Sequence, residues 1–293
     1  TTMGPFLDKL AEEITAVDTF LSNYNLPSPP QYGLVVFVDD YLLANAGAPY
    51  ANVDALRADF EMWNTHTSSN QQVNTPSSNT TWPENSLDAI YAGATVFPWR
   101  PTDDTLRLVI HTTDDTFWDG PTNANGVAIM RGYGETVAAL QDREIRQFTF
   151  ADLLGGPAGD EDVSVGWSTP YMGQAPIPEQ TGGGWWNINE VLSQQVSLAD
   201  ALEGSVVALD PNPREGMMHD RAEFVRGFEA LAASADLVKV GDDDATLLYR
   251  QGLDTVVERL RAAGATAVLA TRGRDGASIV AGTESMTQPI STM

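Results

Sequence analysis

Apolar residues follow two different patterns along this chain. Over residues 6–22 they recur every three or four positions, which predicts an amphipathic helix, and residues 54–64 and 85–97 show similar spacing. Residues 33–38 and 106–111 are instead short, mainly apolar runs. Such runs predict strands that are buried on both faces, so the first part of the chain should alternate helices with buried strands.

The same alternation continues through the rest of the chain. A helix is predicted at 126–142 and a strand at 146–150. After residue 204, short strands again alternate with helical segments, at 205–209, 219–233, 237–240, 243–249, 253–264 and 267–271. This alternation predicts an α/β fold with a mainly parallel, Rossmann-like sheet and helices on both faces. Ligands of such sheets bind beyond the carboxyl ends of the strands, where Asp39 and Asp114 are expected to lie.

A change in composition divides the chain near residue 204. All 7 tryptophans lie at or before Trp186, and a stretch rich in Gly and Pro, residues 155–184, precedes the boundary. We therefore predict one domain over residues 1–204 and a second α/β segment over residues 205–293. Because both parts use parallel strands, the second could supply strands that complete the sheet of the first.

Composition limits the classes of partner. The 293 residues carry a formal net charge of -24, and this negative field repels nucleic-acid backbones. It favours cations or basic partners, although acidic surfaces also serve solubility. No apolar run is long enough to span a bilayer, and the N-terminal residues do not read as a secretion signal. The absence of cysteine excludes disulfides and thiolate metal sites.

Oxygen-bearing side chains gather between Asn79 and Gly120. A polar loop containing Pro83 and Glu84 leads into a predicted helix, and the strand that follows ends at Asp114. Carboxylates, hydroxyls and carbonyls are the ligands that Mg²⁺ and Ca²⁺ prefer, so this stretch predicts a divalent-cation site. The alternative is structural, because proline and an acidic residue commonly open a helix, and Asp114 would then be a turn residue.

Residues 1–204 resemble a von Willebrand factor A-type domain, in particular the variant of integrin β subunits. The strand ends Phe37-Val38-Asp39 and Thr112-Thr113-Asp114 match that family, as does the Pro83-Glu84 loop, in which Thr81 replaces an acid. The resemblance implies a bound Mg²⁺ or Ca²⁺, a protein partner that presents a carboxylate, and an extracellular or cell-surface location. The family's leading aspartate would fall before residue 1. The cation ligands that it implies are Thr2, Asp39, Asn79, Pro83, Glu84 and Asp114.

Residues 205–281 resemble the C-terminal part of a ribokinase-like sugar kinase. The matching segments are VALDPNPR at 207–214, ADLVKV at 235–240 and TRGRDG at 271–276. The resemblance implies that ATP lies beside the last segment. The nucleotide-binding residues that it implies are Asp244, Thr271, Gly273 and Gly276. The GAGD motif, which carries the catalytic base of that family, does not occur in the sequence, so we expect no catalytic turnover.

Three functions are therefore open. The favoured one is a divalent-cation-dependent, adhesion-type protein-binding module without catalytic activity. The second is an ATP-dependent carbohydrate kinase of the ribokinase-like family, or an inactive remnant of one. The third is an artificial or chimeric α/β scaffold without a ligand. Convergence of Asp39, Glu84 and Asp114 within coordination distance would favour the first, whereas ATP turnover with a sugar would favour the second.

Overall fold

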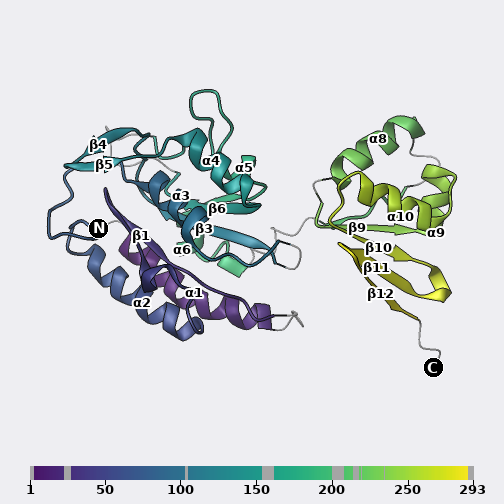
Figure 1. The fold of residues 1–293 in the computed structure, drawn as a ribbon, viewed down its shortest axis with the longest axis horizontal. Helices are drawn as coiled ribbons and strands as arrows, with labels where there is room; N and C mark the ends of the chain where they lie inside the picture. The colour runs from purple at the N-terminus through teal and green to yellow at the C-terminus, as the bar shows by residue number, and fades with distance from the viewer. Residues whose placement is uncertain are drawn as a thin grey trace. The chain divides into compact units, whose positions relative to one another are not determined.

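The computed structural model describes residues 3–22, 28–102, 105–153, 162–199, 208–213, 218, 220–233 and 235–289. The chain forms two compact units, Thr1–Ser205 and Val206–Met293, and each is described by itself (Figure 1). The described strands of the two units belong to different sheets. The expectation that the second part completes the sheet of the first is therefore wrong. Thr2 lies outside the described residues.

Three parallel strands form the main sheet of unit 1. They are β3 (Arg107–Thr113), β6 (Ile145–Ala151) and β7 (Trp185–Asn187), with β6 in the middle. Successive side chains of a strand point to opposite faces. On β6 the side chains of Ile145 and Phe150 are both 1% exposed although they point to opposite faces, so the sheet is covered on both sides.

Two helices cover the face of this sheet that carries Ile145. They are α3 (Ser86–Val96) and α4 (Tyr133–Asp142), which contact each other and pack against Ile145 through Leu87 and Leu140. The side chain of Asn85 caps α3 by accepting from the Asp88 amide, as helix N-termini require. This cap fixes where the polar loop before α3 ends.

The opposite face is covered from the N-terminal part of the chain. Here α1 (Gly4–Ser22) lies beside α2 (Val53–Thr67) and contacts α6 (Ile188–Leu192) (Figure 1). The ring of Phe6 on α1 lies 6.2 Å from that of Phe150 on β6. Helices on both faces of a parallel sheet confirm the predicted α/β class in this unit.

Two predicted elements of unit 1 differ from the structure. The apolar run at 33–38 gives only a short strand, β1 (Val35–Phe37), which pairs antiparallel with β2 (Tyr41–Leu43) and is half-buried. The helix expected over 126–142 begins only at Tyr133, because residues before it form an antiparallel hairpin. Its strands are β4 (Thr122–Ala124) and β5 (Val127–Ile129).

Unit 2 is built on one five-stranded sheet with the order β12-β11-β10-β9-β8. Its first three strands in sequence run parallel, and the last two form an antiparallel extension (Figure 1). The strands are β8 (Ala208–Leu209), β9 (Leu237–Gly241), β10 (Ala267–Thr271), β11 (Ala277–Ala281) and β12 (Glu284–Gln288).

Two helices pack on one face of this sheet, α8 (Arg221–Ala232) and α10 (Leu253–Ala262). Phe228 and Leu260 join the fully buried Val238 and Val268 in a single apolar core. Both valines point to the same face because they are paired across β9 and β10. This core orients the carboxyl ends of the parallel strands.

Short elements connect these layers. They are η1 (Ala44–Gly47), α5 (Ile177–Gln180), α9 (Asp242–Asp244), the π-helical turn η3 (Ala245–Tyr249) and η4 (Gly273–Asp275). Among the described residues, no helix has the length and apolar character needed to cross a membrane.

Candidate functional site

Asp39 lies at the centre of a buried polar cluster in unit 1. It sits in the bend between β1 and β2 and is 0% exposed. Its Oδ1 accepts hydrogen bonds from the Thr81 hydroxyl at 3.1 Å and from Trp118 Nε1 at 3.2 Å. Its Oδ2 accepts from Gln72 Nε2 at 2.7 Å and from the Asn125 amide. Both carboxylate oxygens therefore have protein donors, which offset the cost of burying this group.

Glu84 lies close to this cluster but in a different electrostatic environment. Its backbone is fixed by hydrogen bonds to the segment after β3. The Glu84 amide donates to the carbonyl oxygen of Thr116 at 2.9 Å. Glu84 is partly exposed, and its carboxylate accepts from the Thr113 hydroxyl at 3.5 Å. Burial raises the pKa of that carboxyl well above its usual value, and the charges of Asp115, Asp114 and Asp39 raise it further.

The other predicted cation ligands lie around these two acids. Asn79 Oδ1 accepts from the Thr81 amide at 3.1 Å and so shapes the loop, and Pro83 directly precedes Glu84. Asp114 follows β3, where it acts on Glu84 through its charge. Asp39, Glu84 and Asp114 are thus neighbours. No three histidine or acidic side chains of the described residues are arranged to hold a metal ion, however.

Three residues of this cluster were not anticipated from the sequence. Gln72, Trp118 and Asn125 each donate to the Asp39 carboxylate and lie 33, 79 and 86 positions away from it in the chain. Nothing in the local sequence of these residues indicates that role. Only the tertiary fold, which brings three loops to the carboxyl end of the sheet, creates the contacts.

In unit 2, Asp244 and Thr271 flank the end of β9. The Asp244 carboxylate accepts from the Gly241 amide at 2.7 Å and is nearly buried. A Cβ atom placed on Gly241 would lie 3.1 Å from the Thr271 hydroxyl and 3.4 Å from an Asp244 oxygen. The glycine therefore lets two predicted nucleotide-binding side chains approach one point at the carboxyl edge of the sheet.

Lys239 supplies the positive charge at this edge. Its Nζ lies 3.3 Å from Asp210 Oδ1 and 3.4 Å from Asp244 Oδ2. Partial burial alone would lower the pKa of Lys239, but hydrogen bonds and charge interactions with the two aspartates outweigh it, so the pKa is raised. The sequence pattern included Lys239 and Asp210 as parts of matching segments without assigning them a role in a site.

The turn after β10 holds the two predicted glycines. Gly273 and Gly276 adopt φ of 50° and 96°, which glycine reaches without strain. A Cβ on Gly273 would meet no atom within 4 Å, whereas one on Gly276 would overlap the carbonyl oxygen of Gln288 on β12. The turn is closed by the backbone amide of Arg272, which donates to the carbonyl oxygen of Gly276 at 2.8 Å. Gly273 thus leaves open space beside the turn, and Gly276 packs it against β12.

Comparison with known proteins points to carbohydrate kinases. No protein-family model matches the chain. A fructokinase from Rhizobium leguminosarum bv. trifolii is 35% identical to it over 74 residues, which are 25% of this chain and 23% of the fructokinase. The match therefore spans less than a quarter of the length of that relative.

Likeness to solved structures is weak. The PfkB protein from Polaromonas sp. JS666 is 24% identical, with 30% of this chain and 31% of that chain covered at a TM-score of 0.27. Aminoimidazole riboside kinase from Salmonella enterica is 16% identical, with 55% and 60% covered at a TM-score of 0.29. Scores this low do not establish a shared overall fold.

The favoured expectation of an adhesion-type binding module is wrong. The curated protein that the chain matches is a fructokinase, not a von Willebrand factor A-type protein. The A-type resemblance rested on short strand-end motifs, and such motifs recur wherever parallel strands end in polar loops. The alternative of a ribokinase-like carbohydrate kinase is the better supported one.

Proposed function

We propose that this chain carries part of an ATP-dependent carbohydrate kinase of the ribokinase-like family, and that the carboxyl edge of the unit 2 sheet binds the nucleotide. The observation that carries the proposal is the grouping of Asp244, Thr271 and Lys239 around Gly241. The similarity to fructokinase supports the same class. Because the match covers 23% of that relative, the activity, its sugar and its partners all belong to the proposal.

The groups at this edge suit a nucleoside triphosphate. The Thr271 hydroxyl can donate to a phosphate oxygen, and the open space beside Gly273 lets a phosphate approach the backbone. Asp244 offers a carboxylate oxygen to the water shell of Mg²⁺. Lys239 already holds Asp244 and Asp210 together, so it would orient the acids as well as attract the phosphates. Bound Mg²⁺-ATP would supply the phosphoryl group and neutralise much of its own charge.

Charge predicts that binding depends on Mg²⁺. The chain has a formal net charge of -24, so its field repels free ATP, which is strongly anionic. A magnesium complex carries less negative charge and can use Asp244. We therefore expect measurable binding of Mg²⁺-ATP and much weaker binding of ATP in the presence of a chelator.

Isothermal titration of the whole chain with Mg²⁺-ATP tests the proposal. Thr271→Val removes the hydroxyl at nearly constant volume, and loss of one charge-assisted hydrogen bond should weaken binding about tenfold. Thr255→Val, at an exposed position of α10, is the matched control and should leave the affinity unchanged. Absence of saturable heat with Mg²⁺-ATP, or an equal loss in both variants, would refute nucleotide binding at this edge. Release of ADP with a panel of sugars then tests catalytic turnover separately.

A second proposal concerns the acidic cluster of unit 1. We propose that Glu84, Asp114 and Asp39, together with Asn79 and the Pro83 carbonyl, take up Mg²⁺ or Ca²⁺. The supporting argument is that Asp114, Asp115 and Asp39 lie close enough to Glu84 for their negative charges to raise the pKa of its carboxyl. Because no described group of three such side chains is arranged to hold a metal, the carboxylates would have to close around the ion.

Titration of metal-free protein with Mg²⁺ and with Ca²⁺ tests this second proposal. Glu84→Gln keeps the shape of the side chain but removes its charge, so it should abolish the heat of binding. Glu190→Gln, on the exposed surface of α6, serves as the control. Absence of heat with both ions in the unmodified protein would mean that the cluster is neutralised by a proton instead.

A further inference from the structure

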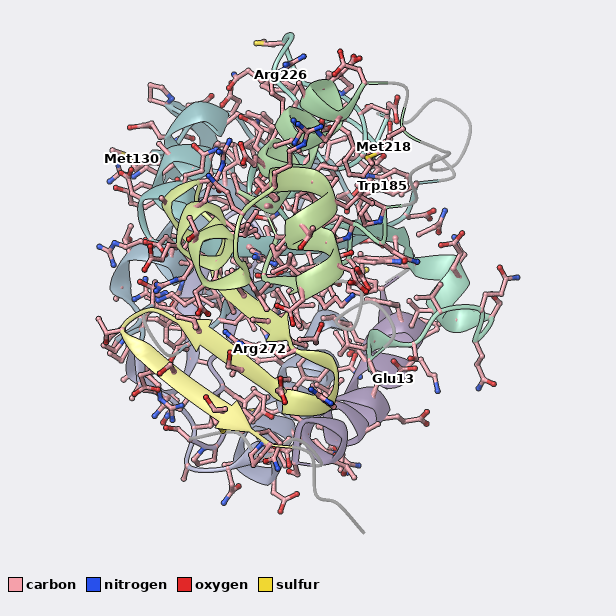
Figure 2. The ribbon with its side chains drawn as sticks, turned by 90° about the vertical axis from the view of Figure 1, so that its right-hand side faces the viewer. Glu13, Met130, Trp185, Met218, Arg226 and Arg272 are labelled. Atoms are coloured by element: carbon pink, nitrogen blue, oxygen red, sulfur yellow. The ribbon has the colours of Figure 1, made fainter. Side chains whose placement is uncertain are left out.

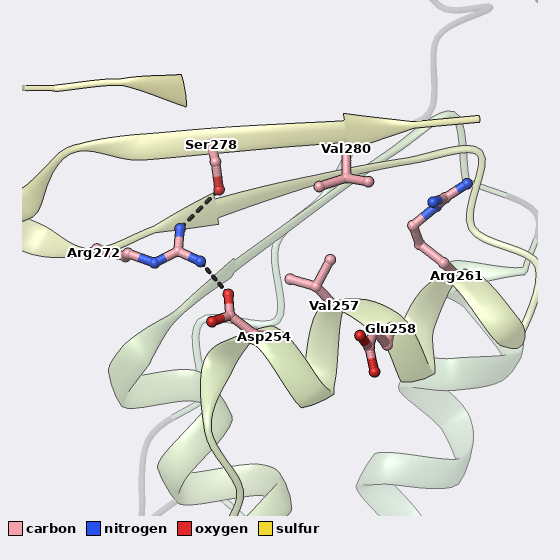
Figure 3. A pocket seen from close by; sticks show the side chains of 7 residues that line it. All are labelled: Asp254, Val257, Glu258, Arg261, Arg272, Ser278 and Val280. Atoms are coloured by element: carbon pink, nitrogen blue, oxygen red, sulfur yellow. Dashed lines mark hydrogen bonds and ion pairs between the residues drawn. The ribbon is translucent and has the colours of Figure 1, made fainter. Parts of the chain in front are cut away.

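A cavity of about 420 Å³ lies in unit 2 between α10 and the β10–β11 strands (Figure 3). Val257 of α10 and Val280 of β11 point toward each other and form its apolar floor, while charged side chains stand around it (Figure 3). Its volume falls within the range of small-molecule sites. None of the side chains proposed to bind the nucleotide or the cation lines this cavity, although Arg272 of the lining belongs to the same turn as Gly273 and Gly276.

One side of the cavity is already neutralised. Arg272 forms an ion pair with Asp254 of α10, and its Nη1 donates to the Ser278 hydroxyl of β11 at 2.7 Å (Figure 3). Two hydrogen-bonding directions of the guanidinium are therefore in use, and the charge of Asp254 is balanced. Because Asp254 and Arg272 already pair with each other, a ligand would gain little from a charge interaction on this side of the cavity.

The other side has an unused donor. Arg261, near the end of α10, donates from Nη2 to the Gly282 carbonyl, but its Nε is buried and has no hydrogen-bond partner among the described residues. A buried N–H without an acceptor costs about 1–3 kcal/mol. Such groups are few in folded proteins, and each calls for an explanation. Because Nε has almost no accessible surface, a ligand acceptor such as a carboxylate would satisfy it only after the Arg261 side chain moves toward the cavity.

An unused acid also lines the cavity. Glu258 precedes Arg261 by one helical turn, is exposed, and forms no ion pair or hydrogen bond within the described part of the chain. Its carboxylate can accept from an ammonium group. Around the apolar floor the cavity thus combines one free cationic donor with one free anionic acceptor.

This pairing selects against simple ions. A phosphate or other dianion would meet Glu258 and Asp254 as well as the field of a chain with net charge -24. A simple amine would meet two guanidinium groups. A zwitterion matches both free groups without a net charge, and an aliphatic body would cover Val257 and Val280.

We propose that this cavity binds a small α-amino acid with an aliphatic side chain. The carboxylate accepts from Arg261, the ammonium donates to Glu258, and the side chain lies on Val257 and Val280. The site does not depend on the nucleotide edge, so it stands or falls independently of the proposed kinase function.

Three ligands test each part of this site on the whole chain. L-Leucine is titrated beside 4-methylpentanoate, which lacks the amino group, and 3-methylbutylamine, which lacks the carboxylate. Binding is followed by the ¹⁵N-edited resonance of the Arg261 Nε–H, which should move when it gains an acceptor. We expect leucine to saturate below about 10 mM and both analogues to bind at least about tenfold more weakly. Equal binding of either analogue, or no saturation by leucine, would overturn the proposal.

Substitutions localise the site. Arg261→Gln and Glu258→Gln should each weaken leucine binding about tenfold or more. Arg226→Gln, on the exposed face of α8 (Figure 2), and Glu223→Gln on the same helix are the matched controls and should bind as the unmodified protein does. If Arg261→Gln unfolds, Val280→Phe fills the cavity from its floor and should abolish binding. Unchanged affinity in a folded Val280→Phe protein would place leucine elsewhere and overturn the assignment.

Discussion

Replacing His111 by phenylalanine should make unit 1 less sensitive to acid. His111 lies on β3 at 3% exposure, between the ring of Phe37 at 5.9 Å and that of Trp167 at 4.4 Å. Neither ring nitrogen has a hydrogen-bond partner among the described residues. Burial among these aromatic rings lowers the pKa of His111 from 6.5 to about 3. The folded protein therefore keeps the imidazole neutral at pH values where the unfolded chain protonates it.

The size of the effect follows from proton linkage. Because the folded pKa is lowered, the stability that depends on neutral His111 is complete above pH 6.5 and declines as the pH falls from 6.5 toward 3. The loss is about 1.4 kcal/mol per pH unit, or about 3 kcal/mol at roughly pH 4.5. His111→Phe removes this proton uptake. A packing change from the larger ring can shift stability by about 1–3 kcal/mol, but by the same amount at every pH.

Urea unfolding followed by tryptophan fluorescence measures this difference. All 7 tryptophans lie at or before Trp186, so the signal reports unit 1 and not unit 2. The free energy of unfolding of the variant relative to the unmodified protein should rise by about 3 kcal/mol between roughly pH 7 and pH 4.5. Phe60→Leu, a buried substitution without a titrating group, should show no such change. A constant difference across this pH range for His111→Phe would refute the linkage argument.

Three further changes test other parts of the structure. Glu84→Gln should stabilise metal-free unit 1 above about pH 5 in the same assay, because the raised pKa of Glu84 makes the unmodified protein lose stability as pH rises. Leu260→Ala should cost unit 2 about 2–5 kcal/mol by calorimetry while the tryptophan transition stays in place. Gly276→Ala should lower the melting temperature of unit 2, because its Cβ would overlap Gln288, whereas Gly227→Ala on α8 meets no atom within 4 Å and should not.

The spacing of apolar residues predicted helices and strands well where each packs one face against a single hydrophobic core. The 3.6-residue spacing over residues 6–22 corresponds to α1, and the alternation of helix and strand in unit 2 corresponds to α8, β9, α10 and β10. In these segments the buried face and the local propensity agree, so the pattern is unambiguous.

The pattern was misleading where turn chemistry overrides it. Residues 122–129 contain Asn125-Gly126, with φ of 50° and 84°, which is the pair that favours a tight hairpin turn. That signal was present but was outweighed by the apparent helical spacing. The run at 33–38 predicts a strand that is buried on both faces, yet Asp39 and Asp40 turn the chain back and pair it with β2 instead.

The sequence could predict site residues only where they lie at the ends of predicted strands. Asp39, Asp114 and Asp244 follow strands and Thr271 ends one, so the sequence could place them at the carboxyl edges of the sheets. It could not supply the partners of Asp39, because Trp118 and its other donors reach that carboxylate across loops that are far apart in the chain. Hydrogen-bond networks of this kind depend on tertiary geometry and carry no local periodicity.

The two carboxyl edges differ in how they neutralise their acids, and this difference sets what each can bind. In unit 2, Lys239 stands between Asp210 and Asp244, so one positive charge offsets part of the two negative charges before any ligand arrives. In unit 1, the charges that act on Glu84 all come from acids, and only the Thr113 hydroxyl opposes them. An edge with such a lysine can accept an anionic nucleotide together with its metal. An edge without it must first draw a proton or a cation from solution, so its ligand affinity should depend on pH and on divalent ions.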